Sequence, residues 1–532
     1  DEAPFPPFES IACGGGDLTR QKKSTRPSVH RQRLNPPPPG GPACPGLRPR
    51  FAQSWWALMT VRCLFSGLWV TLASMALAES PAWPAFRGAN SSGVALTAKP
   101  PAHPGPGGIQ WQVDVPWSPS SPTVSGDRIF LTTFADGKLE TRAYALSDGK
   151  LLWSRVAPAR TLEEFHLTEG SPAAASPVTD GRHVIAYFGS FGLLAYDVDG
   201  TERWQHPLPV ARTEGNFGSG TSPLLLADRV ILNRDVAGGS SILALDLKTG
   251  RTLWETPRPD SPTSYGSPIL WEHDGIREVV VAGSLSMKAY DPATGAERWV
   301  VRGLPSYSCT TPVIGDGLLF FAGWAPGKSD SPWPSWESTV ERQDKNADGR
   351  ISVEEFSDGP VWFKAQDVDS DGWLTRQDWD AIGGLMKKGE NVLIAVRPGG
   401  KGDITDTHVA WKATRGLPYV PCPLYYDGRV YLVKDGGMVS SFDAKTGQPG
   451  YTQERLPAQG GYYASPVAAD GRLYFTSLQG KLTVVKPGGS KPEVLHEADF
   501  GERIAGTPAL AGDRILVRTQ SKLMLVGEAA GR

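Results

Sequence analysis

Residues 289–299 read AYDPATGAERW, in which an alternating apolar segment runs into a tight turn and ends on a tryptophan. Close relatives of this stretch are AYALSDGKLLW at 143–153, AYDVDGTERW at 195–204 and LALDLKTGRTLW at 243–254. The alternation predicts a β-strand, and the Asp, Thr and Gly residues predict a reversal into the next strand. Each stretch closes on a tryptophan that we expect to pack between neighbouring units: Trp153, Trp204, Trp254 and Trp299.

A second repeated feature is a Ser/Thr/Cys-Pro pair. It occurs at Ser121-Pro122, Ser176-Pro177, Ser222-Pro223, Ser267-Pro268, Thr311-Pro312, Cys422-Pro423, Ser465-Pro466 and Thr507-Pro508. Successive prolines lie 42 to 55 residues apart, except for the 111 residues from Pro312 to Pro423. A fixed period of this length is typical of a repeat architecture. The overlong interval indicates an insertion, which we place at 324–391.

The residues after each pair complete the repeat. In VSGDRIFLTT (124–133) and YYDGRVYLVKD (425–435), an apolar run, an acidic or glycine turn and an alternating stretch follow one another. This order predicts consecutive antiparallel strands, so each repeat is one four-stranded sheet. Such sheets bury their faces by stacking radially. The sequence therefore predicts an all-β fold, an eight-bladed β-propeller over 79–532, with a small α-helical insertion in blade five.

The last repeat stops before its tryptophan strand. The missing piece stands near the beginning, in GPGGIQWQVDVP at 105–116, where Trp111 takes the anchor position. We expect this strand to complete the eighth blade and close the ring, which removes the unpaired edges of the sheets.

The N-terminal segment differs from the repeats. Residues 1–58 are rich in Pro, Gly and Arg, which predicts a disordered upstream extension. Residues 59–78 have the layout of a signal peptide cleaved near Ala78. The uncharged run from Cys63 to Ala78 is 16 residues long, and a membrane span needs about 18 or more. We therefore expect no stable membrane span and a periplasmic or secreted location.

The charge balance limits the possible partners. The 54 Lys and Arg residues nearly equal the 56 Asp and Glu residues, so we expect no nucleic-acid binding. The eight histidines are scattered without zinc-ligand spacing, and a Gly-x-Ser-x-Gly nucleophile motif is absent from the sequence. We therefore assign no catalytic residues and lean away from an enzyme.

The repeated AxDxxTGxxxW unit, its eight copies and WPAFRG at 83–88 resemble the PQQ-type (quinoprotein-type) β-propeller repeat proteins exported by planctomycete-like bacteria. Such propellers serve quinone dehydrogenases, outer-membrane assembly scaffolds and other proteins. The dehydrogenases hold pyrroloquinoline quinone (PQQ) on a disulfide between adjacent cysteines, with calcium at the ring centre. Cys309 and Cys422 are not adjacent, so we do not expect PQQ. A quinone-dependent oxidoreductase using the channel mouth remains the alternative function.

The resemblance also raises the questions of lipid attachment and of disulfide pairing at the cysteines. Lipoprotein scaffolds of this type carry a lipid-attachment cysteine at the signal cleavage site, whereas Cys63 comes too early for that role. In the mature chain only Cys309 and Cys422 remain, and export would permit a disulfide between them. The sequence leaves their pairing open.

The insertion contains the pattern DKNADGRISVEE at 344–355. Its oxygen ligands, at the spacing of an EF-hand calcium loop, are Asp344, Asn346, Asp348, the carbonyl of Arg350, Ser352 through water, and Glu355. Gly349 stands where the loop needs a sharp turn, and Ile351 stands where paired loops form a short β-bridge. We expect calcium binding here.

A second loop, DVDSDGWLTRQD at 367–378, repeats the layout. Its ligands are Asp367, Asp369, Asp371, the carbonyl of Trp373, Thr375 and Asp378. Asp378 replaces the usual glutamate, and its shorter arm makes bidentate coordination harder. We therefore expect weaker calcium binding or a better tolerance of magnesium at this loop.

The aromatic residues of the insertion allow two roles. They could form a groove that calcium exposes, as in a sensor, or the small core of a structural calcium clip. We favour the clip, because an exported protein meets steady calcium. The residues concerned are Trp333, Trp336, Trp362, Phe363, Trp373, Trp379 and Met386.

The loops before the Ser/Thr/Cys-Pro pairs should gather at one end of the channel. They carry His166, Glu169, Arg212, Asn216, Tyr265, Tyr307, Tyr419, Tyr462 and Arg503. These side chains suggest a polar, aromatic-lined funnel for a protein or small-molecule ligand, although turn residues line the ends of any propeller. We expect a monomeric calcium-binding scaffold or ligand-binding module.

Overall fold

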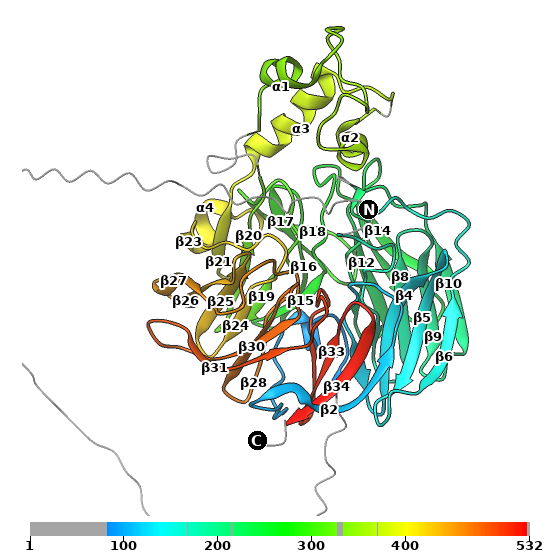
Figure 1. Cartoon of the computed structure of the whole chain (residues 1–532), viewed down its shortest axis with the longest axis vertical. Coiled ribbons are helices and arrows are strands. Elements are labelled where there is room, and N and C mark those ends of the chain that lie inside the picture. Colours follow the sequence, from blue (N-terminus) through cyan, green and yellow to red (C-terminus); the bar gives the residue numbers. More distant parts are fainter. Residues whose placement is uncertain (1–81, 167–168, 214–215, 327–332, 370, 529–532) are drawn as a thin grey trace, which may run out of the picture. The chain divides into compact units, whose positions relative to one another are not determined.

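Eight separate antiparallel sheets make up the part of the chain that the computed structural model describes, residues 82–528 without 167–168, 214–215, 327–332 and 370 (Figure 1). The expected upstream extension, 1–58, and the signal peptide, 59–78, lie outside the described residues. Each sheet has four strands or, in two cases, five. The predicted eight-bladed β-propeller is confirmed.

The blades follow one another along the chain. Blades one to four consist of β3 (Thr123–Ser125), β4 (Arg128–Ala135), β5 (Lys138–Ala145) and β6 (Leu151–Val156); β7 (Val178–Thr179), β8 (His183–Phe188), β9 (Gly192–Asp197) and β10 (Glu202–Pro207); β11 (Leu224–Leu225), β12 (Arg229–Arg234), β13 (Ser241–Asp246) and β14 (Thr252–Pro257); and β15 (Ile269–His273), β16 (Ile276–Ala282), β17 (Ser286–Tyr290) and β18 (Glu297–Arg302).

Blades five to eight consist of β19 (Val313–Gly315), β20 (Leu318–Gly323), β21 (Val392–Val396) and β23 (Val409–Ala413); β24 (Leu424–Tyr426), β25 (Arg429–Lys434), β26 (Met438–Asp443) and β27 (Pro449–Arg455); β28 (Val467–Ala469), β29 (Arg472–Thr476), β30 (Lys481–Lys486) and β31 (Glu493–Asp499); and β32 (Ala509–Ala511), β33 (Arg514–Arg518), β34 (Lys522–Glu528) and β2 (Pro104–Asp114). First strands of neighbouring blades, such as β3 and β7, contact one another, so they line the central axis.

The ring closes as predicted. Strand β2, from the start of the described chain, pairs antiparallel with β34, with Trp111 opposite Leu525. This pairing joins the two ends of the repeat array in one sheet. Blade eight therefore has no vacant outer position where the last repeat stops.

A ring of hydrogen bonds explains the Ser/Thr/Cys-Pro pairs. The backbone N–H of each residue before proline donates to the side chain of the equivalent residue in the next blade, at 2.9 to 3.2 Å. The order is Ser121, Ser176, Ser222, Ser267, Thr311, Cys422, Ser465, Thr507 and back to Ser121. Each of these residues is buried, so each bond satisfies an N–H that has left water.

The tryptophan anchors join neighbouring blades, as the sequence predicts. The indole N–H of Trp254 donates to the carbonyl of Pro292 in the next blade at 3.1 Å. Its ring lies against Gly295, whose φ is +74°, and a Cβ on Gly295 would come within 2.4 Å of the ring. The turn therefore needs glycine for its backbone conformation and for the close approach of the tryptophan. Equivalent indole bonds come from Trp111, Trp153, Trp204 and Trp411.

Trp299 departs from this pattern. Its indole donates to Glu278 within its own blade at 3.0 Å. A short extra strand, β22 (Gly402–Asp403), pairs in parallel with β18 at Trp299, and α4 (Thr405–His408) follows it. The corresponding loop of blade five, residues 397–408, thus differs from the Asp-x-x-Thr-Gly turns of blades three, four and six and does not supply the acceptor of this indole.

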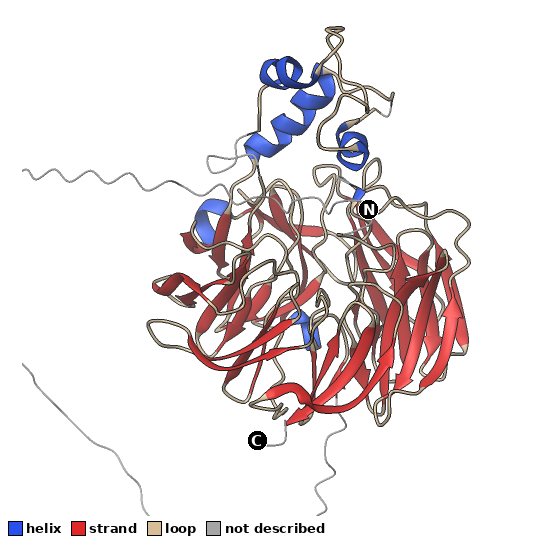
Figure 2. Cartoon of the chain, viewed as in Figure 1, coloured by secondary structure: helices blue, strands red, loops and turns tan. Residues whose placement is uncertain are grey.

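Helices α1 (Trp336–Gln343), α2 (Pro360–Gln366) and α3 (Arg376–Lys388) lie between β20 and β21, while strands dominate elsewhere (Figure 2). Asn391 joins the two ends of this insertion through hydrogen bonds to the backbone of Ala325 at 2.9 and 3.0 Å. Its buried core contains Trp336, Ile351, Phe356, Phe363, Leu374 and Trp379. The expected bridge is present, with Ile351 paired antiparallel to Leu374.

The leader 82–101 crosses the end of the channel where the first strands finish. It contains β1 (Ala82–Trp83), which pairs with β3, and the short 3-10 helix η1 (Ala89–Ser91). The leader bonds to five further blades at Thr179, Leu270, Pro423, Ala468 and Gly512. The buried Arg87 reaches the carbonyl of Pro423 at 2.7 Å. The WPAFRG segment is therefore part of the ring's inner packing.

Candidate functional site

The end of the channel opposite the leader is lined by the loops that precede the first strands. Its centre is Glu169, whose carboxylate accepts a hydrogen bond from the hydroxyl of Tyr463 and lies 3.9 Å from the guanidinium of Arg503. Arg503 also lies 5.7 Å from the ring of Trp117 and 5.8 Å from that of Tyr463. Four loops from four blades thus meet in one charged and aromatic cluster, which we call the funnel cluster.

Tyrosines extend this cluster. Burial raises the pKa of Tyr419 well above its usual value, and the neighbouring Cys309, Tyr265, Tyr463 and Tyr307 raise it further. Their mutual influence means that these groups lie close together. Each of these five residues is half-buried. Such rings offer flat apolar faces and hydroxyl groups to a ligand.

Acidic groups around the funnel differ in burial. The carboxylate of Asp435 accepts the backbone N–H of Tyr462 at 2.7 Å. Burial raises the pKa of Asp435, and the charge of Glu169 adds to this effect. Glu163 is 2% exposed and its Oε2 accepts from the N–H and Oγ of Ser219 at 3.1 and 2.7 Å. Burial raises the pKa of Glu163 to about 8, although these hydrogen bonds oppose the shift.

The structure separates some residues that the sequence analysis groups. Tyr462 is 1% exposed and belongs to a blade core, where its hydroxyl donates to Ala458. Its neighbour Tyr463 takes the place expected for it. Arg212 is exposed and its carbonyl accepts from Ala237 in the adjacent strand connection. Asn216 is buried and its N–H bonds to Thr213, so its role is local.

His166 lies beside the funnel cluster rather than in its centre. Its ring stacks on Phe217 at 5.5 Å and its Nδ1 accepts the N–H of Glu169 at 3.2 Å. Burial lowers the pKa of His166, and the nearby Glu169 opposes this shift. The imidazole is therefore biased toward its neutral form.

Trp117, Tyr463 and Asp435 were not predicted from the sequence. A positional signal exists for the first two. Tyr463 stands two residues before Ser465, as Tyr265 stands two before Ser267. Trp117 stands four residues before Ser121, the offset that Tyr307 and Arg503 share in their own repeats. Alignment on the Ser/Thr/Cys-Pro pairs would have found both aromatic residues.

The two cysteines are free thiols. Cys422 is buried, and its sulfur accepts the N–H of Thr311 at 3.2 Å in the hydrogen-bond ring. Burial raises the pKa of Cys309 to about 12. Cys422 therefore acts as a substitute for the serine or threonine of other blades, and these residues do not fit the vicinal-disulfide platform of a quinone site.

The first candidate metal loop, 344–355, folds around its own acidic side chains. Asp344 accepts the N–H of Gly349 at 2.9 Å, and Glu355 accepts from the backbone of Lys345, Asn346 and Ser352 at 2.9 to 3.2 Å. Hydrogen bonds from Ser352 lower the pKa of Glu355. The backbone of this loop thus turns toward the carboxylates of Asp344 and Glu355.

The second loop, 367–378, repeats these contacts. Asp367 accepts from Gly372 at 3.0 Å, and Asp378 accepts from Val368 and Thr375 at 3.1 and 3.0 Å. Asp367, Asp369 and Asp371 each place one oxygen within 4.8 Å of the others. A hard cation with six to eight oxygen ligands suits such a donor set. The donor set of the second loop therefore suits such a cation, and the first loop carries the same types of oxygen ligand at the same positions.

The two loops also touch through their seventh residues. The guanidinium of Arg350 lies 3.5 Å from the centroid of the Trp373 ring. With the bridge between Ile351 and Leu374, this contact makes the loops one paired unit.

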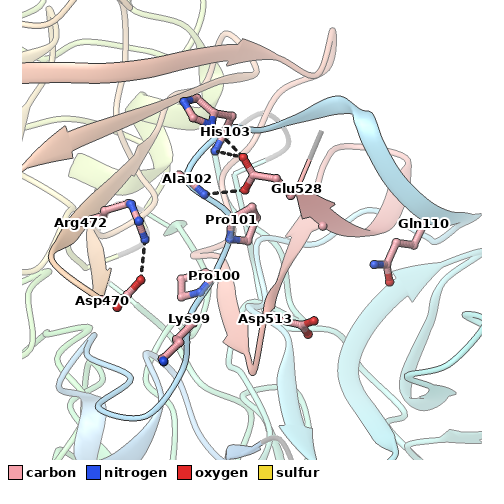
Figure 3. A pocket seen from close by; sticks show the side chains of 11 residues that line it. Lys99, Pro100, Pro101, Ala102, His103, Gln110, Asp470, Arg472, Asp513 and Glu528 are labelled. Carbon is pink, nitrogen blue, oxygen red and sulfur yellow. Dashed lines mark hydrogen bonds and ion pairs between the residues drawn. The ribbon is translucent and has the colours of Figure 1, made fainter. Parts of the chain in front are cut away.

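A pocket of ≈ 390 Å³ lies where the leader meets blades seven and eight (Figure 3). Glu528 accepts from the N–H of Ala102 at 2.8 Å and from the N–H and Nδ1 of His103 at 3.1 and 2.8 Å. Arg472 pairs with Asp470 at 2.8 Å. The bonds of Glu528 to Ala102 and His103 thus hold the end of the leader segment against blade eight.

Among the described residues, no helix has the length and apolar character needed to cross a membrane.

Comparison with known proteins gives a family match over most of the chain. The family described as outer membrane protein assembly factor BamB matches residues 102–222, 217–305 and 357–531. A comparison with curated protein sequences finds no match.

Several solved structures are similar to this chain at low sequence identity. BamB from Moraxella catarrhalis is 13% identical, with a TM-score of 0.48, over 79% of this chain and 97% of its own. The computationally designed protein Ika8 is 12% identical, with a TM-score of 0.46, over 82% and 98%. A europium-containing methanol dehydrogenase is 12% identical, with a TM-score of 0.49, over 83% and 89%.

Proposed function

The chain belongs to the outer membrane protein assembly factor BamB family, and from this premise we propose that it is an exported calcium-binding β-propeller that acts as a scaffold or binding module. The ligand, a protein segment or a small molecule, binds at the funnel cluster. The inserted loops 344–355 and 367–378 hold calcium.

The observation that carries this proposal is the difference between the two ends of the channel. The leader bonds across one end, where Arg87 is buried and donates to the carbonyl of Pro423. The other end carries Glu169, Arg503 and half-buried tyrosines. Aromatic side chains with a few convergent polar groups are typical of a binding site.

Calcium binding is supported by the donor set. Both loops offer oxygen ligands at the EF-hand positions, and their backbones already turn the carboxylates inward. Asp378 at the last position of the second loop makes this the weaker site. A calcium ion in each loop would stabilise the paired unit as a structural clip.

Quinone-dependent oxidation is the less favoured function. The sulfur of Cys422 belongs to the hydrogen-bond ring, so it does not offer a disulfide platform with Cys309. Addition of PQQ and calcium to purified protein tests this alternative. A bound-cofactor absorbance band with dye-linked alcohol oxidation would replace the binding role with an enzymatic one.

The calcium proposal is tested by calorimetric titration of the chelator-treated full chain. We expect two binding events, and we expect Asp344→Ala and Asp367→Ala each to remove one of them. The matched control is Asp406→Ala, which changes an acidic residue of α4 outside both loops. An absence of calcium-dependent heat in the parent chain would end this part of the proposal.

The binding role is tested by a photo-crosslinking residue at position 307, compared with one at position 445 in an exposed turn. We expect a defined adduct from cell-envelope extract at position 307 and none at 445. Equal labelling at both positions would show that the funnel has no special affinity.

A further inference from the structure

We infer that calcium binding in the second loop is coupled to the funnel through α2, the helix that touches the loops of the propeller. The inference rests on the proposed function, because it requires loop 367–378 to bind calcium. It adds a regulatory link between that loop and the ligand site.

Helix α2 is attached directly to the second loop. The first ligand, Asp367, follows the last helical residue, and its N–H donates to the carbonyl of Phe363 at 3.0 Å. The Phe363 side chain is 5% exposed and packs in the same core as Ile351 and Leu374, the two bridge residues. The position of α2 therefore depends on the geometry of both loops.

The outer side of α2 contacts two propeller loops. The Trp362 ring lies 6.0 Å from the ring of His166 and 5.5 Å from that of Phe217. Lys364 forms an ion pair with Glu164. These residues come from the loops that precede blades two and three, so the insertion contacts the same end of the channel as the funnel cluster.

A short path leads from this contact to the centre of the funnel. His166 accepts the backbone N–H of Glu169 at 3.2 Å. The carboxylate of Glu169 accepts from Tyr463 and pairs with Arg503. A displacement of the His166 ring by α2 therefore acts on the backbone that positions this carboxylate.

Calcium binding changes the angle between the flanking helices in sensor EF-hands, whereas buffer EF-hands barely open. The inferred coupling requires a shift of α2 of the first kind, in addition to the stabilisation of the paired loops. If the contact of Trp362 with His166 and Phe217 differs in strength between the ion-free and ion-bound positions of α2, calcium affinity and funnel geometry are linked. The linkage is reciprocal, so a change in the propeller loops must alter calcium affinity. Phe217 lies far along the chain from both calcium loops, which makes it the most informative position.

The experiment measures calcium binding to the full chain by titration calorimetry. Phe217→Ala and Trp362→Ala remove the contact from its two sides. The matched control is Phe134→Ala, because Phe134 packs edge-on against Phe165 at 5.4 Å in the same region of the propeller. We expect calcium affinity at one site to change by about 5-fold or more in both test variants, and to equal that of the parent in the control.

A charge exchange gives an independent measurement with exposed residues that do not endanger folding. Lys364→Glu and Glu164→Lys should each change calcium affinity in the same direction, and the double variant should restore it. Amide exchange of the peptide that contains Phe217 should slow on addition of calcium in the parent, and this response should be lost in Trp362→Ala.

The outcomes separate the two proposals. Equal calcium affinities in the parent and all variants, with no calcium effect on exchange at Phe217, would overturn the coupling and leave calcium binding intact. No calcium binding in the parent would remove the proposed calcium site and the coupling with it.

Discussion

The backbone N–H of Thr507 donates to the Oγ of Ser121 at 2.9 Å and joins residues 386 positions apart in the sequence. This bond completes the circle of eight equivalent bonds that begins at Ser121. Strand pairing of β2 with β34 closes the same junction further from the axis. The two ends of the repeat array are therefore joined both close to the channel axis and further out in blade eight.

The hydrogen-bond ring predicts the effect of replacing Cys422. Cys422→Ser keeps a side-chain acceptor for the buried N–H of Thr311, whereas Cys422→Ala leaves that N–H without a partner. An unsatisfied buried donor costs about 1–3 kcal/mol. Denaturant unfolding should thus show Cys422→Ala less stable than Cys422→Ser by about that amount. Equal unfolding midpoints would mean that the ring bonds add nothing to stability.

The repeated sequence pattern predicted most of the fold, because the same requirements for turns and for packing between blades recur along the chain. The Asp-x-x-Thr-Gly turn, the tryptophan and the Ser/Thr/Cys-Pro pair each make one contact with the next blade. Trp299 does not follow the pattern. The altered loop of blade five offers no acceptor for its indole N–H, which bonds to Glu278 instead, and β22 pairs with its strand. The exception depends on a long-range pairing that no local pattern encodes.

The funnel was predicted less completely. The positions of Glu169, Arg503 and Tyr419 in the loops before the Ser/Thr/Cys-Pro pairs led us to group them, but loop position does not show which way each side chain faces. Tyr462 and Tyr463 are adjacent, and only the alternation of the backbone decides that Tyr462 enters the blade core. The contact between Trp362 and Phe217 joins an insertion to a distant loop, so the sequence holds no signal for it.

A buried ion pair lies in blade three and is linked by a hydrogen bond to blade four. Arg258 and Asp235 are both buried, with Nε to Oδ1 at 2.7 Å, and Arg258 also donates to the hydroxyl of Tyr290 at 2.6 Å. Asp235→Ala leaves the Arg258 guanidinium buried without its carboxylate partner, which lowers the free energy of unfolding by about 3–5 kcal/mol. Denaturant unfolding should show this loss, while Asp228→Ala, which removes an exposed partner of Arg229, should cost about 0–1 kcal/mol. Similar small losses in both variants would contradict the predicted importance of this pair.

Glu163 predicts a specific pH dependence. Burial raises its pKa from 4.5 to about 8 in the folded chain, so the folded state holds a proton that the unfolded state releases. The contribution of Glu163 to the free energy of unfolding therefore falls as pH rises from 4.5 to about 8. Glu163→Gln cannot ionise, and its melting temperature should fall less than that of the parent across this interval. If the melting temperatures of the two proteins fell equally across this pH interval, the protonated state assigned to the buried Glu163 would be wrong.

The central claim is that a calcium-clipped insertion is built into a closed propeller, and scanning calorimetry of the full chain with calcium or with chelator tests it most directly. Calcium at about 100 times its Kd adds about 2.7 kcal/mol to the stability of the unit that binds it. We predict that chelator lowers the melting temperature of one small transition, from the insertion, and leaves the larger propeller transition in place. The Asp344→Ala, Asp367→Ala double variant should behave like the chelated parent in both conditions. Superimposable traces of the parent with calcium and with chelator would contradict the account.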